Sequence, residues 1–365
     1  MPVKSSLWHR LVFSPTFAVA LVLALLTLFA STRYDGFTSA YNISSVLRYN
    51  SMFALVALGM CFVIMTGGID LSVGTVAAMS SVVSAHLSPY GLGAGLAGGL
   101  AAGFAAGMIN GLVITRLKIL PFIATLATML AASGTALLLA NNQTVSVSYD
   151  TAFTTLGQGD ILTSLRPEWM DAEDMGPVTR LLGFLFAFPI PAFIAIAAYV
   201  VGALVLNHTA FGRHVLAVGG GQDASRLMGL PVNRTIFSVY LISGTCAGMA
   251  GVILSSQFGA GQPIEGIGWE LFAIASVVVG GTLLTGGKGS IGGTLAGAML
   301  LGVIFTVLNF ENGMGWISLS AYWQSVVRGG FLFLVVVLQS KLARPSALQT
   351  SAVPPKPADP GIGTA

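Results

Sequence analysis

The chain has 365 residues, of which 55% are hydrophobic and only 8% are charged. A soluble globular domain carries about 25% charged residues, so this composition excludes a soluble enzyme and indicates a polytopic membrane protein. The formal net charge of +3 agrees with basic loops on one side of a membrane and does not indicate a nucleic-acid-binding surface.

Apolar segments long enough to cross a bilayer, about 20 residues each, recur along the chain. The first is longer than a typical signal-peptide core and no clear cleavage site follows it, which favours an uncleaved span over a signal peptide. We therefore expect an all-α, polytopic transmembrane helical bundle of about ten spans. The candidates are 11–31, 46–66, 71–88, 91–115, 120–140, 181–206, 236–257, 268–285, 290–309 and 321–340.

Basic residues in the loops predict the orientation, because Lys and Arg are enriched in cytoplasmic loops. This rule places residues 1–10, the loop 207–235 and the Pro-rich, disordered tail 341–365 in the cytoplasm. The transmembrane domain then covers residues 11–340 and includes the loop 207–235. The acidic loop 141–180 then lies outside. Arg33 and Arg48 are exceptions, since the scheme also places them outside.

Two Gly-rich turns, 66–75 and 285–294, join neighbouring spans. Each contains Thr-Gly-Gly, then a charged residue, then Ser-aliphatic-Gly; the charged residue is Asp70 in the first turn and Lys288 in the second. Corresponding broken helices in two halves of a chain are typical of transporters with internal repeats. The alternative is two unrelated tight turns, in which Gly supplies unusual backbone angles. Eight or nine spans with one Gly-rich re-entrant segment fit the sequence as well as ten.

Asp70, in the first of these turns, is the only acidic residue between Asp35 and Asp150. A carboxylate at a membrane is costly and is by default a functional candidate. We interpret it as an N-terminal cap of the following helix, with Ser72 as a second cap. A direct role in substrate binding or coupling is the alternative.

The loop 207–235 is a polar island between two long apolar segments, and it holds Arg213, Arg226 and Arg234. Ala224, Leu227 and Met228 have a spacing compatible with a short helix. The sequence has no phosphate-binding loop, nucleophile elbow or metal-ligand cluster, and its spans carry few carboxylates. We therefore predict no catalytic residue, no metal and no directly bound cofactor. If the protein is a pump, its energy would come from a partner that binds this loop.

Two further acidic residues, Glu265 and Glu270, flank the span 268–285 on its predicted outer side. We interpret both as solvated or capping residues rather than proton carriers.

Four blocks in order, 57–74, 118–126, 212–244 and 270–297, resemble the membrane permeases of bacterial sugar ABC importers of the ribose, galactose and xylose type. The resemblance covers about residues 45 to 340. Within that family, Asn309, Phe310, Glu311, Trp316, Tyr322 and Trp323 resemble the galactofuranose-importing permeases. The acidic loop near 160–176 is longer than the family pattern.

The resemblance implies a multi-pass permease of the bacterial inner membrane, surrounded by lipid, that forms the pathway for a monosaccharide. Its implied partners are an ABC ATPase subunit that hydrolyses ATP, a second permease and a periplasmic sugar-binding protein. It assigns ATPase coupling to Gly212, Arg213, Ala217, Gly219, Gly220, Ala224 and Gly229, and a pathway or structural motif to Gly67, Gly68, Asp70, Ser72 and Gly74.

Other readings of the sequence stay open. A self-sufficient secondary carrier or channel, or a permease of the same family for a nucleoside or a signalling furanone, are the alternatives.

Overall fold

The computed structural model describes residues 15–161 and 188–314, together with the helical positions 323, 326, 327, 329, 330, 333 and 337. The predictions for residues 1–10, for most of the acidic part of the loop 141–180 and for the tail 341–365 fall outside these ranges. So do two of the aromatic residues in the galactofuranose resemblance, Trp316 and Tyr322.

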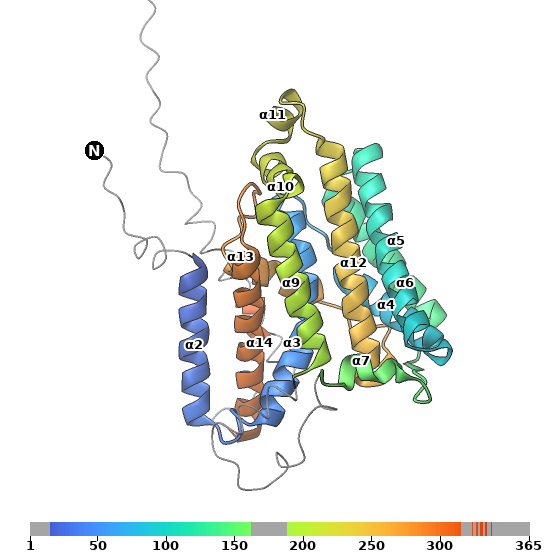
Figure 1. Ribbon diagram of the computed structural model, residues 1–365, viewed down its shortest axis with the longest axis vertical. Coiled ribbons are helices and arrows are strands. Elements are labelled where there is room, and N and C mark those ends of the chain that lie inside the picture. The colour runs from blue at the N-terminus through green and yellow to red at the C-terminus, as the bar shows by residue number, and fades with distance from the viewer. Residues whose placement is uncertain are drawn as a thin grey trace, which may run out of the picture.

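Within the described residues, seven helices are long and apolar enough to cross a membrane. They lie side by side along the long axis of the molecule (Figure 1), which confirms the predicted helical bundle. These helices are α2 (Pro15–Arg33), α3 (Ala40–Met65), α5 (Leu92–Arg116), α6 (Pro121–Leu139), α9 (Ile190–His208), α12 (Val232–Phe258) and α14 (Ile291–Met314).

Two further apolar helices are too short to span a membrane. Helix α4 (Val73–Leu87) has 15 residues and α13 (Trp269–Val279) has 11. At 1.5 Å per residue they reach roughly 22 Å and 16 Å, less than the roughly 30 Å of a hydrocarbon core. The predicted spans 71–88 and 268–285 are therefore discontinuous helices, as expected for broken segments. The second ends early because Gly280 and Gly281 follow it, and Gly281 has a φ of +90°.

Short elements cover the two ends of the bundle. One end carries α10 (Ala210–Gly220) and α11 (Gln222–Leu227), and the opposite end carries α7 (Thr155–Gln158) (Figure 1). The remaining short elements are η1 (Ser88–Tyr90), η2 (Ala152–Thr154) and the antiparallel pair β1 (Val145–Ser146) and β2 (Ala260–Gly261), in which Val145 pairs with Gly261. We call the two ends the α10 end and the α7 end.

The core is built on α3 and on a glycine contact between α5 and α12. Every residue of α3 from Asn50 to Met65 is buried, as expected for a helix that is apolar on all sides. A Cβ at Gly103 would lie 2.3 Å from the carbonyl oxygen of Gly244, and one at Gly244 would lie 2.4 Å from that of Gly103. Small residues four apart allow this backbone approach in lipid.

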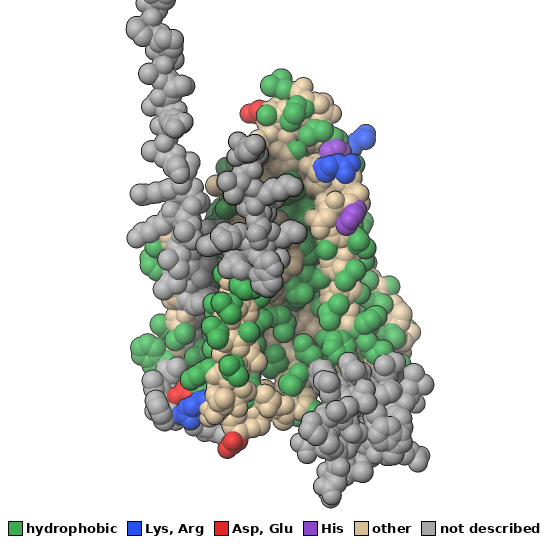
Figure 2. Space-filling model, turned by 60° about the vertical axis from the view of Figure 1, so that its left-hand side comes forward, with side chains coloured by type: hydrophobic (Ala, Val, Ile, Leu, Met, Phe, Trp, Pro, Cys, Tyr) green, Lys and Arg blue, Asp and Glu red, His purple; other side chains and the backbone are tan. Residues whose placement is uncertain are grey.

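Charged side chains lie towards the two ends in the view of Figure 2, and hydrophobic side chains cover the region between them. The arginine exceptions at the α7 end have partners. Arg48 donates to the carbonyls of Gly157 (3.0 Å) and Gly159 (3.3 Å) and pairs with Asp160. The guanidinium of Arg33 lies 5.5 Å from the ring centroid of Tyr34. A paired Arg48 is compatible with the side that the charge rule assigns to acidic loops.

Candidate functional site

The polar island of the sequence forms two consecutive short helices at the α10 end. Helix α10 begins after Thr209, whose side chain accepts a hydrogen bond from the backbone N–H of Gly212 at 3.2 Å. Helix α11 follows directly and ends before Gly229, which has a φ of +76°. The short helix expected in this loop is therefore present.

The outer surface of these helices is exposed and partly apolar. Arg213, Ala224 and Gly229 are exposed, as docking residues should be. The side chains of Leu227 and Met228, at the end of α11, are 91% and 66% exposed. Helix α11 extends past the ends of the neighbouring helices in Figure 1, and these two apolar residues lie at its C-terminal end.

The inner surface of α10 packs against the backbone of the bundle. A Cβ at Gly212 would lie 2.0 Å from the carbonyl oxygen of Leu206. A Cβ at Gly219 would lie 1.8 Å from the carbonyl oxygen of Met65, whereas one at Gly220 meets nothing within 4 Å. Gly212 and Gly219 are thus internal contacts, while Gly220 is open. The coupling residues inferred from the sequence divide between the two surfaces.

Both Gly-rich connecting segments meet α10 at Gly219. The backbone N–H of Gly287 donates to the carbonyl of Met65 at 3.0 Å. A Cβ at Gly286, which has a φ of +83°, would lie 2.8 Å from the nitrogen of Gly67 and 3.0 Å from the carbonyl oxygen of Gly219. We call this contact of Met65, Gly67, Gly219, Gly286 and Gly287 the glycine junction. It connects the α10–α11 loop to the segments that lead into α4 and α14.

The two segments that resemble each other in sequence therefore lie side by side. Each is followed by a helix, α4 with 15 residues and α14 with 24. Because these helices differ in length, the two segments are not followed by the same structure. An internal repeat stays a prediction.

Asp70 is fully buried below this junction. Its Oδ1 accepts hydrogen bonds from the N–H (3.0 Å) and the hydroxyl (2.6 Å) of Ser72, and its Oδ2 accepts one from the hydroxyl of Ser243 (2.8 Å). Ser243 lies 11 residues into α12, roughly 16 Å along that helix. The carboxylate therefore lies well inside the bundle, where hydrogen bonds replace the water it has lost.

The capping interpretation of these residues needs correction. Ser72 is the N-cap residue of α4, but its side chain makes no capping hydrogen bond. Its hydroxyl donates to Asp70 and accepts from the amide of Asn110 (3.0 Å), whose oxygen accepts from Thr128 (2.6 Å). The side chains thus join α4, α5, α6 and α12, because in an apolar interior a polar group is stabilised best by another buried polar group. The correction applies to Ser72, because Asp70 accepts the N–H of Ser72 at the start of α4, as a cap does, while it also connects this turn to α12. A direct role of Asp70 in substrate binding or coupling stays an alternative.

Gly68 and Gly74, the other two glycines of the motif that includes Gly67, lie in close contact with neighbouring segments. A Cβ at Gly68 would lie 2.5 Å from the hydroxyl oxygen of Tyr240, and one at Gly74 would lie 2.0 Å from the carbonyl oxygen of Gly266. Beside Gly68 is a cavity of about 200 Å³ that Lys118 and Arg226 also line. Gly68 and Gly74 therefore permit contacts that a larger residue would block.

Sequence reasoning placed the two sets of site residues on separate loops, and the structure brings them together at Gly67 and Gly219. The sequence did not identify Ser243, Asn110 and Tyr240 as site residues, because they are ordinary polar residues within spans. Gly286 and Gly287 did have a signal, the Thr-Gly-Gly likeness to the first turn. In the described part of the chain, no group of three His, Cys, Asp or Glu residues could hold a metal ion.

Comparison with known proteins identifies relatives over most of the chain. A family model described as "Branched-chain amino acid transport system / permease component" matches residues 42–336. The ribose import permease protein RbsC of Bacillus subtilis (strain 168) is 36% identical over 322 residues, which cover 87% of this chain and 91% of that protein. No solved structure gives a significant match.

Two relatives from Escherichia coli (strain K12) are similarly close. The L-arabinose transport system permease protein AraH is 35% identical over 323 residues, covering 88% of this chain and 89% of AraH. The inner membrane ABC transporter permease protein YjfF is 36% identical over 318 residues, covering 86% and 88% respectively.

Proposed function

The chain belongs to the family of permease components described for branched-chain amino acid transport systems, and from this premise we propose that it forms the membrane pathway of an ATP-driven importer for a monosaccharide. The observation that carries the proposal is the similarity, over 87–88% of the chain, to permeases named for ribose and L-arabinose. The relative named as an ABC transporter permease supports the ATP-driven mode.

In this proposal an ATPase subunit binds the α10–α11 loop from the cytoplasm. The exposed Leu227 and Met228 provide apolar contact area, and the exposed Arg213 provides charge. An amphipathic helix that lays its apolar side chains into a groove is a common recognition mode. The orientation, with the α10 end and both termini in the cytoplasm, is inferred from the charge rule.

Motion of the ATPase reaches the pathway through the glycine junction. Helix α10 contacts both connecting segments by backbone, with Gly219 against Met65 and beside Gly286. A displacement of α10 cannot be absorbed by side-chain rotation there, so it shifts the starts of α4 and α14. Packed backbone contacts of this kind switch between discrete arrangements. A periplasmic binding protein delivers the sugar at the α7 end, and a second permease completes the pathway.

The substrate class is tested by uptake. The chain is isolated in complex with its own ATPase and binding protein, placed in liposomes, and offered radiolabelled D-ribose, L-arabinose, D-galactose and L-leucine with ATP. Accumulation of one sugar without leucine supports the proposal. Accumulation of leucine without any sugar contradicts it and assigns the chain to the amino acid transport that the family description names.

A further inference from the structure

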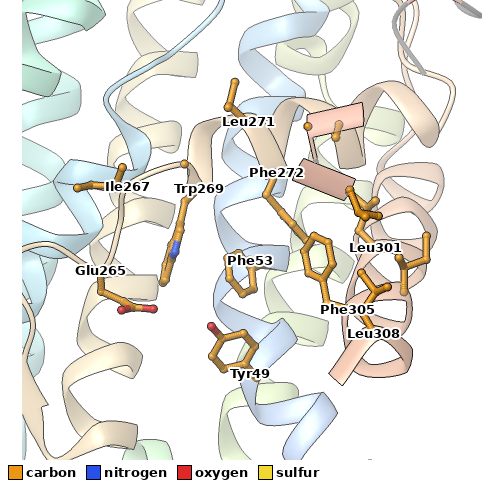
Figure 3. A pocket seen from close by; sticks show the side chains of 15 residues that line it. Tyr49, Phe53, Glu265, Ile267, Trp269, Leu271, Phe272, Leu301, Phe305 and Leu308 are labelled. Carbon is orange, nitrogen blue, oxygen red and sulfur yellow. The ribbon is translucent and has the colours of Figure 1, made fainter. Parts of the chain in front are cut away.

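A pocket of about 370 Å³ lies between α3, α13 and α14, away from the glycine junction (Figure 3). Its volume falls within the roughly 300–1,000 Å³ of small-molecule sites. Residue 327 also lines it, so a fourth segment reaches the same pocket.

The pocket lies near the middle of the bundle in depth. Phe53, on its wall, comes 13 residues after Ala40 and 12 before Met65 in α3. The discontinuous helix α13 begins at the same place, since Trp269 and Phe272 also line the pocket. Secondary transporters bind substrate near the bilayer midplane, at the ends of discontinuous helices, and the same arrangement is present here.

Aromatic rings form much of the wall. The ring centroid of Phe53 lies 4.7 Å from that of Trp269, 4.5 Å from that of Phe272 and 5.2 Å from that of Tyr49. A further ring, Phe305, lies 5.6 Å from Phe272. These contacts bury Phe53, Trp269 and Phe272 and hold Tyr49 in place. Tyr49, which is 39% exposed, offers flat apolar surface to a ligand.

Polar groups stand on one side of this wall. Figure 3 shows the carboxylate of Glu265, the indole of Trp269 and the hydroxyl end of Tyr49 on the same side of Phe53. Glu265 lies in the connection between α12 and α13 and is half-buried, and burial raises the pKa of its carboxyl above the usual value. The interpretation of Glu265 as a solvated or capping residue rather than a proton carrier stays a prediction.

We propose that this pocket is the contact site for the sugar in transit, with a sugar ring stacked on Tyr49 and its hydroxyl groups hydrogen-bonded to Glu265. A sugar ring has apolar C–H faces and a rim of hydroxyl groups, which match an aromatic wall and a carboxylate respectively. A lipid chain would use the apolar wall but would leave Glu265 without a matching group. The inference rests on the proposed function, because it names where the proposed substrate binds.

The site is connected to the proposed energy input. A Cβ at Gly74, in the first turn of α4, would lie 2.0 Å from the carbonyl oxygen of Gly266, and Gly266 lies between the pocket residues Glu265 and Ile267. The connecting segment that leaves the glycine junction thus leads, through α4, to backbone contact with the pocket. A shift at the junction would reach Glu265 by this route.

The test measures the amount of sugar moved per ATP hydrolysed by the complex in liposomes, using whichever of the four radiolabelled compounds the wild type accumulates. Glu265→Gln and Tyr49→Phe change only a polar group and preserve shape, and Tyr49→Ala removes a ring that is 39% exposed. Thr135→Val and Phe104→Ala are matched controls, because both side chains are exposed on spanning helices and neither lines the pocket.

We expect Glu265→Gln and Tyr49→Ala to lower the sugar moved per ATP at least ten-fold, with ATP hydrolysis within two-fold of the wild type and both controls unchanged. Wild-type sugar transport in both Glu265→Gln and Tyr49→Ala would overturn the pocket assignment but not the proposed function of sugar import. Transport of leucine alone by the wild-type complex would overturn the proposed function itself, and this assignment with it.

Discussion

Single residues at the glycine junction and at Asp70 connect elements that lie far apart in the sequence. Gly219 touches Met65 and Gly287, and Asp70 bonds Ser72 and Ser243. Both are places where the identity of one side chain, or the lack of one, decides whether two helices can approach. Single substitutions therefore test the role of these contacts most directly.

Gly219→Ala places a methyl group 1.8 Å from the carbonyl oxygen of Met65, so the backbone has to move. Overpacking of this kind costs about 1–3 kcal/mol. We expect a lower thermal midpoint of the detergent-purified chain and a transport rate reduced about ten-fold. The adjacent Gly220→Ala is the control, because nothing lies within 4 Å of its Cβ. Equal behaviour of the two variants would remove the glycine junction from the mechanism.

Asp70→Ala removes three hydrogen bonds and leaves the hydroxyls of Ser72 and Ser243 without their acceptor. Since a hydrogen bond contributes about 0.5–1.5 kcal/mol and a buried donor left unsatisfied costs about 1–3 kcal/mol, the cost is on the order of 3 kcal/mol or more. We expect less folded protein in size-exclusion profiles and little change in sugar affinity, with Asp150→Ala as the exposed control. A stable variant with an altered sugar preference would favour direct contact of Asp70 with the substrate.

At the scale of elements, α11 and the two discontinuous helices α4 and α13 set this chain apart from a simple bundle. Helix α11 carries exposed apolar side chains at the α10 end, and α4 and α13 both begin inside the bundle. In the proposed mechanism, α11 receives the force from the ATPase, and α4 and α13 move in response.

Leu227→Asp places a charge at the 91% exposed tip of α11, where it cannot disturb internal packing. Loss of a central apolar contact weakens an interface by roughly 2 kcal/mol, or about thirty-fold. The ATPase should therefore no longer co-purify with the variant, while the Tyr90→Asp control at the α7 end should retain it. Undiminished co-purification with Leu227→Asp would show that the ATPase binds elsewhere.

Gly229→Val forces a β-branched residue to a φ of +76° directly after α11. This conformation costs an L-residue about 1–2 kcal/mol, so the loop changes shape. ATP hydrolysis by the complex should continue while sugar uptake falls. Gly36→Val is the matched control, because Gly36 has a φ of +77° and open surroundings at the other end of the molecule. Full sugar uptake by Gly229→Val would show that this turn is not needed to couple ATP hydrolysis to transport.

Composition and periodicity were sufficient to predict the bundle, because membrane crossing requires long apolar helices whatever their neighbours. They could not predict the depth at which α4 and α13 begin, since an apolar segment looks the same whether it is helical or extended. The short helix in the loop 207–235 was predictable from the spacing of Ala224, Leu227 and Met228. The Asp70 network was not, because Ser243 and Asn110 gain their role only when α12 and α5 pack against the turn.

The whole molecule has two different ends and a pocket between them. The α10 end carries exposed Arg213, Arg226 and Arg234, and the α7 end carries Arg48 paired with Asp160. The pocket lined by Phe53 lies between the ends, and the glycine junction lies between that pocket and the docking loop. This order is what a pathway driven from one side requires.

The orientation can be tested with introduced cysteines, because native Cys61 is fully buried and Cys246 lies within α12. Asp223→Cys, in α11, should react with a membrane-impermeant maleimide only after cells are opened, and Asp150→Cys should react in intact cells. The reverse pattern would invert the orientation and place the docking loop outside.

The most direct test of the central claim is sugar uptake into liposomes that contain the chain with and without its ATPase, binding protein and ATP. The account predicts uptake only when all three are present, and ATP hydrolysis that the sugar-loaded binding protein stimulates. Uptake of sugar by the chain alone, without ATP, would contradict the account and make the protein a self-sufficient carrier.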